Sequence, residues 1–287
     1  MSKITINLIQ EMRKQTGLGM TKCKDALVRS EGNVEKAIEI LRKEGQLSAL
    51  KKEGRDTKEG LIGICQNESM IALVEIDSET DFVVRNEKFV DFLNGITKQA
   101  AQLGKQVSLD EFINMPCSLD DSLSIDQYKN VLVQTFGENI QIKRIKLIEK
   151  KDNCLYGIYS HMQGKIVGFL EVESANKVDN KDASFVKDIA MHIVSENPEY
   201  LCVEDVPQEL KEKEKEIALS QIKNKPEHIA QKIVEGKMRT FYEQVVLLEQ
   251  KFVKDNSLTI KAYLEKVSKK FSTSFNVKCF YRWVVGE

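Results

Sequence analysis

The sequence predicts an α+β protein: a small three-helix N-terminal domain, then two related α+β halves, the second interrupted by an antiparallel helical hairpin. Three observations lead to this class. Apolar residues recur at helical spacing in the first fifty residues, alternate as in strands from residue 61, and give way to a highly charged helical stretch after residue 207. With 287 residues, the chain is long enough for about two domains.

Composition narrows the classes of function. The chain carries 43 Lys+Arg against 44 Asp+Glu, so it lacks the positive excess typical of proteins that bind nucleic acid directly. The longest uncharged stretch, residues 153–164, is too short to cross a membrane, and Glu11 near the start argues against a signal peptide. Six scattered cysteines without a Cys-x-x-Cys pair indicate free thiols. We therefore expect a cytoplasmic protein that binds neither membrane nor nucleic acid.

Residues 1–55 are predicted to form the three-helix domain. Apolar residues mark the three helices: Leu8, Ile9 and Met12, then Met20, Cys23 and Leu27, then Val34, Ala37, Ile38 and Leu41. Asn33 can cap the third helix, and Gly45 is placed to end it in a left-handed turn. Because so small a core is marginal alone, we expect this domain to dock on the rest of the chain or on a partner.

Residues 56–150 are predicted to form the first α+β half, after a charged linker at 51–58 that contains glycine. Apolar, β-rich runs at 61–65 and 70–76 have the pattern of a hairpin. A long helix should follow Asn86, with an apolar face made by Phe89, Phe92, Leu93, Ile96, Ala100 and Leu103. A further helix over 126–135 and a returning strand from Ile140 to Leu147 complete this half.

The second half, residues 151–198 and 240–287, repeats the first in outline. The segments Gly63-Ile64-Cys65 and Leu73-Val74-Glu75-Ile76 recur as Gly157-Ile158-Tyr159 and Phe169-Leu170-Glu171-Val172. A helix over 180–195 and a final strand over 275–285 follow. The pattern favours a duplication, although any two β-hairpins can share such short apolar segments.

The inserted hairpin is predicted at residues 199–239. A run of alternating charges at 209–216 opens the first helix, and Pro226 separates it from the second, so the two helices should return antiparallel as a coiled coil. Such a charge run is typical of an ordinary solvated helix face, and an arm that contacts another molecule is the alternative.

Enzyme motifs are largely missing from the sequence. It contains no phosphate-binding loop and no dinucleotide fingerprint, and its three histidines, His161, His192 and His228, belong to no metal-binding motif. We therefore expect no cofactor, no metal site, no catalytic residues and no bond-making chemistry. A cysteine nucleophile with a histidine base is left open, because such partners meet only in the fold.

The most unusual short segment runs from Asp77 to Val84, with three carboxylates beside Phe82. It could bind a hard cation, form a general acid/base pair, cap the next helical turn or press into a partner. Taken alone, the residues favour helix capping, with Phe82 in the core.

Blocks over most of the chain resemble the bacterial translation elongation factor Ts family. Residues 12–27, Met-Arg-Lys-Gln-Thr-Gly-Leu-Gly-Met-Thr-Lys-Cys-Lys-Asp-Ala-Leu, resemble its N-terminal signature, and Glu79-Thr80-Asp81-Phe82-Val83 resembles its second. Further similar blocks are Gly137-Glu138-Asn139-Ile140, Ile189-Ala190-Met191-His192, Pro198-Glu199-Tyr200 and Val234-Glu235-Gly236-Lys237-Met238. Their order matches that of the family from residue 12 to residue 238.

The resemblance implies a guanine-nucleotide exchange factor that acts on elongation factor Tu, a GTPase, in the cytoplasm during protein synthesis. It implies that Thr80, Asp81, Phe82 and Val83 enter the GTPase near its Mg²⁺ and phosphate site and promote GDP release. The three-helix head resembles a ubiquitin-associated domain that docks on the GTPase, here through Leu18 and Met20, and His161 fits a further contact. The helical arm implies possible homodimers, and a helical module found after the last strand in some members is not expected here.

Two other functions remain open on the residues. One is a general interaction protein whose head binds helical partners without exchange activity. The other is an enzyme that uses Asp77, Glu79 and Asp81 as acids or metal ligands. Accelerated GDP release separates the first from an exchange factor, and stoichiometric binding of a divalent metal would favour the second.

Overall fold

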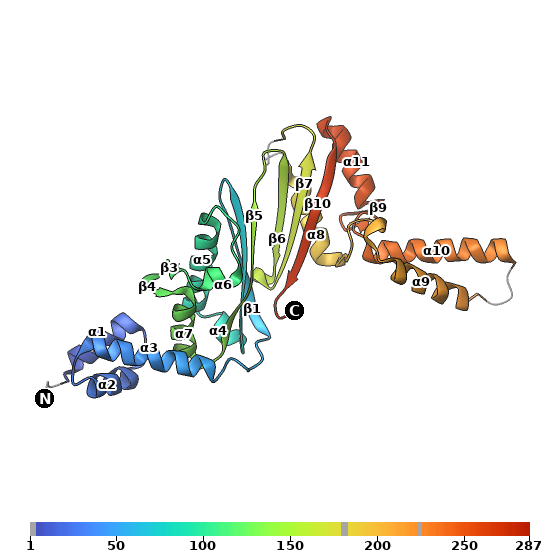
Figure 1. The fold of residues 1–287 in the computed structure, drawn as a ribbon. Helices are drawn as coiled ribbons and strands as arrows, with labels where there is room; N and C mark the ends of the chain where they lie inside the picture. Colours follow the sequence, from blue (N-terminus) through green and yellow to red (C-terminus); the bar gives the residue numbers. More distant parts are fainter. Residues whose placement is uncertain (1–3, 179–182, 223–225) are drawn as a thin grey trace. The chain divides into compact units, whose positions relative to one another are not determined.

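A computed structural model describes residues 4–178, 183–222 and 226–287 of the chain. It confirms an α+β protein (Figure 1). The chain forms two compact units, Met1–Lys150 with Val285–Glu287, and Lys151–Val284. The predicted division into a head, two halves and an inserted hairpin stays a prediction, and each unit is described by itself below.

The first unit begins with the three expected helices, α1 (Ile6–Thr16), α2 (Met20–Arg29) and α3 (Val34–Leu50). Asn33 caps α3 as predicted, because its side chain accepts a hydrogen bond from the Lys36 N–H. Gly17, at φ 69°, ends α1 in a left-handed turn. Their buried apolar side chains form a small core: Ile9, Met12, Leu18, Cys23, Ala26, Leu27, Ala37 and Leu41.

The predicted end of α3 at Gly45 is wrong, because the helix continues to Leu50. Gly45 lies inside the helix and is buried. A Cβ atom there would lie 3.2 Å from Oε1 of Gln134. The glycine therefore serves close packing of α3 on helix α7 (Ile125–Phe136) and does not terminate the helix.

The head docks on the rest of its own unit through polar side chains. Lys22 Nζ donates to the Gln134 carbonyl at 3.0 Å, and Lys52 Nζ donates to the Val133 carbonyl at 3.4 Å. The Arg42 guanidinium donates to Oγ of Ser122 at 3.0 Å. The expectation that this small domain needs support is thus met within the chain.

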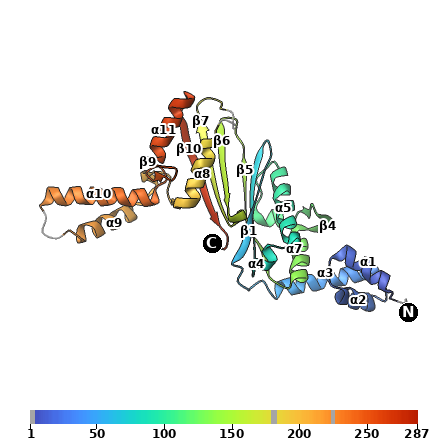
Figure 2. The same cartoon turned by 180° about the vertical axis from the view of Figure 1, so that it is seen from behind.

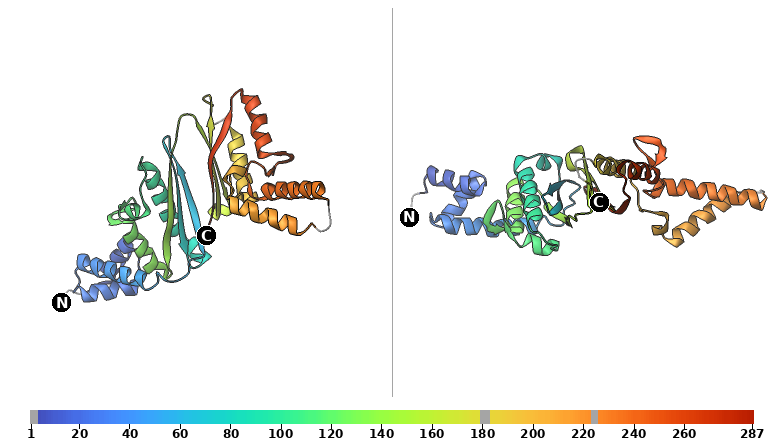
Figure 3. Two further views of the ribbon diagram at one scale, coloured as in Figure 1. Left: turned by 45° about the vertical axis from the view of Figure 1, so that its right-hand side comes forward. Right: turned by 90° about the horizontal axis from the view of Figure 1, so that it is seen from above.

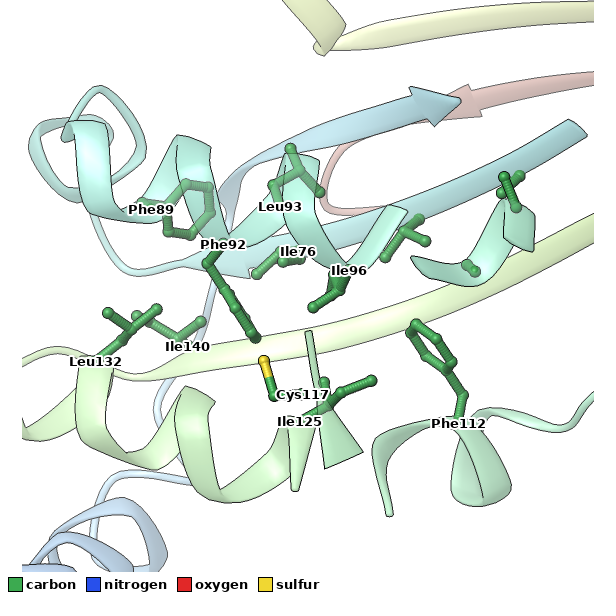
Figure 4. Packing of buried hydrophobic residues seen from close by; sticks show 14 of the residues in the cluster. Ile76, Phe89, Phe92, Leu93, Ile96, Phe112, Cys117, Ile125, Leu132 and Ile140 are labelled. Carbon is green, nitrogen blue, oxygen red and sulfur yellow. The ribbon is translucent and has the colours of Figure 1, made fainter. Parts of the chain in front are cut away.

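A three-stranded antiparallel sheet forms the centre of the first unit. Its order is β1 (Glu59–Gln66), β2 (Met70–Ser78), β5 (Ile140–Glu149), as the predicted hairpin and returning strand require. The predicted long helix is α5 (Glu87–Gln102), capped by Asn86. Phe92 of α5 points toward Cys117 and Ile125 in the core that this helix shares with α7 (Figure 4). Four short elements were not predicted: α4 (Asp81–Val84), α6 (Leu109–Ile113), β3 (Pro116–Cys117) and β4 (Asp120–Ser124).

The second unit has a matching antiparallel sheet of order β10 (Phe275–Val284), β7 (Ile166–Ser174), β6 (Cys154–His161). Helix α8 (Ser184–Glu196) lies against this sheet (Figure 2). The start predicted for α8, at residue 180, lies outside the described residues. The elements that sequence reasoning missed are two 3₁₀ turns, η1 (Met162–Gly164) and η2 (Val203–Asp205), with β8 (Lys251–Phe252), β9 (Asp255–Thr259) and α11 (Ile260–Phe271).

The two sheets repeat one another in register. Gly63 pairs with Val74 in the first, and Gly157 pairs with Leu170 in the second, which is the correspondence of the repeated segments in the sequence. From β3 to β5 and from β8 to β10, counterparts keep a constant separation of 135 residues: Pro116 and Lys251, Ser124 and Thr259, Ile125 and Ile260, Phe136 and Phe271, Ile140 and Phe275.

The helical hairpin consists of α9 (Gln208–Ser220) and α10 (Glu227–Val245), which lie side by side in every view (Figures 1 and 3). Its second helix continues to Val245, past the end predicted at residue 239. Backbone hydrogen bonds join the two ends of the insertion: the Tyr200 N–H donates to the Val245 carbonyl at 3.0 Å, and the Leu247 N–H donates to the Tyr200 carbonyl at 2.8 Å.

Strand β2 carries a buried acidic pair, Glu75 and Asp77. Arg144 donates to Glu75 at 2.6 Å, whereas both carboxylate oxygens of Asp77 lack a hydrogen-bond partner among the described residues. Burial, followed by the nearby charge of Glu75, raises the pKa of Asp77 to about 7. A salt-bridged Glu75 beside a protonated Asp77 is the arrangement that fits these surroundings.

Replacing Gly157 by alanine should destabilise the second unit by about 2 kcal/mol or more, as overpacking does when backbone must move. An added Cβ would overlap the Val186 carbonyl and lie 3.2 Å from the Lys187 nitrogen. Urea unfolding measures the loss. Gly54→Ala is the matched control, because its Cβ would meet no atom within 4 Å, and equal effects of the two changes would contradict the packing argument.

Asp77 should make the protein less stable as pH rises. Its pKa is about 7 in the folded chain against an ordinary 3.8, so between these values the unfolded chain releases the proton more readily. The free energy of unfolding should therefore fall with rising pH by at most about 1.4 kcal/mol per unit and level off above pH 7. Urea unfolding from pH 5 to 8 should show this decline in the natural chain and a smaller one in Asp77→Asn. Identical slopes would refute the assignment.

Candidate functional site

The turn after β2 exposes one large aromatic side chain. Residues Asp81–Val84 form the single helical turn α4, in which Val83 and Val84 belong to the buried core of the first unit. Phe82 directly precedes these two anchored residues, yet 84% of it is exposed. A phenyl ring so placed gains nothing from its own fold, since it covers almost no apolar surface there.

A pair of carboxylates fixes this turn to the corner between α7 and β5. The Glu138 carboxylate accepts hydrogen bonds from the Thr80 N–H at 3.0 Å, from Thr80 Oγ1 at 2.8 Å and from Ser78 Oγ at 3.4 Å. In return, Glu79 Oε1 accepts from the Asn139 N–H at 2.6 Å. We call this reciprocal set, Glu79 with Asn139 and Glu138 with Thr80, the carboxylate clamp.

Further polar contacts extend the clamp. Arg55 donates to Glu79 at 3.3 Å, and the Asn139 side chain donates to the Arg55 carbonyl at 3.0 Å. Asp81 forms an ion pair with Arg85 at 2.9 Å, one helical turn away, and both side chains remain partly open to solvent. Hydrogen bonds to ionised carboxylates are stronger than neutral ones, so the turn that carries Phe82 is held firmly on both sides.

The interpretation favoured by the residues alone is therefore wrong. Thr80 occupies the N-cap position of α4, but its side chain caps no helical N–H and bonds to Glu138 instead. Phe82 does not belong to the core. The Glu138 carboxylate instead holds the Thr80 hydroxyl, which donates to it at 2.8 Å.

The three carboxylates of this segment do not gather into one site. Asp77 is buried in β2, Glu79 belongs to the clamp, and Asp81 pairs with Arg85. Across the residues that the structure describes, no group of three or more His, Cys, Asp or Glu side chains is placed to hold a metal ion. An enzyme that uses Asp77, Glu79 and Asp81 together has no geometric support.

The two head residues differ in accessibility. Leu18 is 3% exposed and packs inside the head core, whereas Met20, at the start of α2, is 43% exposed. Of the two, Met20 is the one with apolar surface open to solvent. Leu18 supports the loop before α2 from within.

His161 ends strand β6 in the second unit, at the tip of the β6–β7 hairpin. Its ring Nδ1 lies 3.3 Å from the Tyr159 hydroxyl, and the residue is exposed. Met162 and Gln163, at φ 49° and 58°, adopt left-handed backbone in the tight turn that follows. Met162 is exposed as well, so the tip presents an imidazole beside an apolar side chain.

The structure thus brings Thr80, Asp81, Phe82 and Val83 together with Glu138 and Arg85. Met20 lies in the head and His161 in the other unit. Sequence reasoning did not predict the role of Glu138. The residue that could have pointed to it is Gly137, because a glycine after a helical stretch commonly ends the helix in a left-handed turn. In the structure Gly137, at φ 81°, ends α7 in this way, and the Glu138 carboxylate that follows turns toward β2.

None of the helices among the described residues combines the length and the apolar character that crossing a membrane requires.

Comparison with known proteins gives a consistent result. The family model described as "Elongation factor TS" matches residues 79–287. The chain is 47% identical to the Elongation factor Ts of Protochlamydia amoebophila (strain UWE25) over 287 residues, which is 100% of both chains. It is 42% identical to that of Chlamydia caviae and 39% identical to that of Chlamydia muridarum, again over 100% of both chains.

The match to the family model covers the Thr80–Val83 turn, strand β5, the whole second sheet and the helical hairpin, and the relatives align from end to end. The chain belongs to the elongation factor Ts family.

Proposed function

We propose that this chain is the guanine-nucleotide exchange factor of translation elongation that acts on elongation factor Tu. It binds the GDP-loaded GTPase, disturbs the Mg²⁺ and phosphate site, and releases GDP so that GTP can bind. The chain itself makes and breaks no covalent bond in this role. The observation that carries the proposal is the exposed ring of Phe82 on a turn whose backbone the clamp holds in place.

Phe82 acts as an apolar wedge. Transfer of its ring from water into another protein would contribute about 1.5–3 kcal/mol. Because Val83 and Val84 are anchored in the core and Glu138 holds Thr80, little conformational freedom remains to be lost when the ring inserts. A rigid wedge can separate packed side chains of the GTPase and displace the groups that hold Mg²⁺ and phosphate.

Asp81 brings a negative charge next to that wedge. Arg85 orients the carboxylate at 2.9 Å but leaves it partly exposed, so it can repel phosphate or compete for its hydrogen-bond donors. Loss of Mg²⁺ leaves the charge of the diphosphate poorly neutralised. By linkage, a factor that binds the nucleotide-free GTPase more tightly weakens nucleotide binding by the same ratio.

Other surfaces support the same encounter. We infer that Met20 provides an apolar contact from the head and that His161 provides one from the second unit. The arm formed by α9 and α10 offers exposed Ile217 and Leu219 for self-association, which makes a homodimer part of the proposal. No direct contact with nucleic acid or membrane is proposed, and action in the cytoplasm stays a prediction.

Phe82→Ala should slow GDP release from elongation factor Tu by about tenfold or more, the equivalent of roughly 1.4 kcal/mol of lost wedge burial. Stopped-flow release of a fluorescent GDP analogue measures it. The fold should be unaffected, since the ring packs on nothing. Val253→Ala, an exposed apolar truncation in the second unit, is the control. If Phe82→Ala leaves the rate of GDP release unchanged, Phe82 does not act as a wedge.

Glu138→Gln should slow the same release by about fivefold while the protein stays folded, because the neutral amide makes weaker hydrogen bonds to Thr80 and loosens the turn. Combining it with Phe82→Ala should give less than the product of the two effects, since a loosened turn matters only when it carries the wedge. If the double variant slows GDP release by the full product of the two single effects, Glu138 does not act through the wedge.

A further inference from the structure

A cavity of about 530 Å³ opens beside the clamp in the first unit. Its walls come from the end of α3, the start of α7 and strand β5, and its volume lies within the range of about 300–1,000 Å³ typical of ligand sites. Ala49, Leu50, Ile140 and Ile142 give it an apolar floor and rim.

Four amide side chains line the cavity, Gln46, Asn130, Asn139 and Gln141, and the last three donate hydrogen bonds from their NH₂ groups to the protein. Asn130 donates to Asp126 at 3.0 Å, Asn139 donates to the Glu53 and Arg55 carbonyls at 3.3 and 3.0 Å, and Gln141 donates to the Glu53 carbonyl at 3.1 Å. Their carbonyl oxygens remain as acceptors. Asn130 is only 8% exposed, and its Oδ1 has no hydrogen-bond partner in the described part of the chain.

The charged side chains that line the cavity are mainly acidic. Glu53 and Asp126 contribute two carboxylates, and Lys129 contributes one ammonium, which Asp126 holds at 2.6 Å. Glu53 is exposed and makes no ion pair with any residue in the described ranges. The lining therefore offers two carboxylates and several amide oxygens as acceptors, and its net charge is −1.

We propose that this cavity receives an arginine side chain, with its flanking residues, from the GTPase partner. A guanidinium offers five N–H donors in one plane, which suits several converging acceptors better than the three donors of a lysine ammonium. Its aliphatic stem can lie on the apolar floor. The volume exceeds that of one side chain and so admits neighbouring residues of a protein segment.

The occupant is assigned to the same partner because the cavity and the clamp that holds the wedge share Asn139. Asn139 lines the cavity through its side chain and belongs to the clamp through its backbone N–H. Glu53 fixes that side chain through its carbonyl. This assignment of the occupant rests on the proposed exchange function, whereas the preference of the cavity for a guanidinium does not.

Water is the competing occupant. Asn130 also borders a second cavity of about 30 Å³, which has room for one water molecule. If such a water satisfied Oδ1 and the larger cavity had no preference, an arginine compound would bind no better than a neutral one of the same shape.

The first test uses the whole chain and N-acetyl-arginine amide, with N-acetyl-citrulline amide as the neutral isostere. Side-chain amide signals of Asn130, Asn139 and Gln141 in ¹H–¹⁵N spectra should shift saturably with the arginine compound and about tenfold more weakly with citrulline, since charge-assisted bonds are lost. Equal binding of the two compounds, or shifts scattered over the surface, would overturn the proposal.

The second test removes the free carboxylate. Glu53→Gln should weaken arginine binding and speed dissociation of the complex with nucleotide-free elongation factor Tu by about fivefold, while Glu35→Gln, an exposed site in the first turn of α3, should change neither. If Glu53→Gln affects the small compound but not the complex, the partner assignment is wrong. The first test contains no GTPase, so its outcome is independent of whether Phe82→Ala slows GDP release.

Discussion

The exchange of hydrogen bonds between two corners of the first unit is the interaction on which the candidate site depends. Glu138 satisfies the backbone and hydroxyl of Thr80, and Glu79 satisfies the backbone of Asn139. Each carboxylate comes from one corner and accepts hydrogen bonds from the other, so the turn after β2 and the turn after α7 cannot move independently. Without this constraint, an exposed phenyl ring on a four-residue helical turn would fold back onto the nearest apolar surface, as hydrophobic burial favours.

This constraint explains how the chain exposes an apolar group without becoming unstable. The core is complete without Phe82, because Val83 and Val84 on the same turn already close it. The polar side chains around the ring, Asp81 and Arg85, satisfy each other. The exposed ring is thus separate from the side chains that stabilise the fold, so burying it against another molecule would remove no contact from the core of this chain.

Sequence reasoning anticipated what rests on periodicity and missed what rests on tertiary contacts. The head helices, α5, α7 and both sheets follow from apolar spacing and caps such as Asn33 and Asn86. Short strands such as β3 and β8 give no such signal, whereas α11 gave one that was overlooked, with Ile260, Leu264 and Val267 at helical spacing behind a Thr259 cap. Gly45 and Glu138 could not be assigned from sequence, because one depends on Gln134 and the other on Thr80.

The hydrogen-bonded ends of the helical insertion have an evolutionary consequence. Backbone bonds between Tyr200 and the 245–247 segment close the base of the arm, so the repeated second half keeps its register whatever lies beyond. Loop-closure entropy grows only slowly with length. Lineages can therefore lengthen, shorten or exchange this appendage by insertions and deletions at a single locus, leaving the candidate site of the first unit untouched.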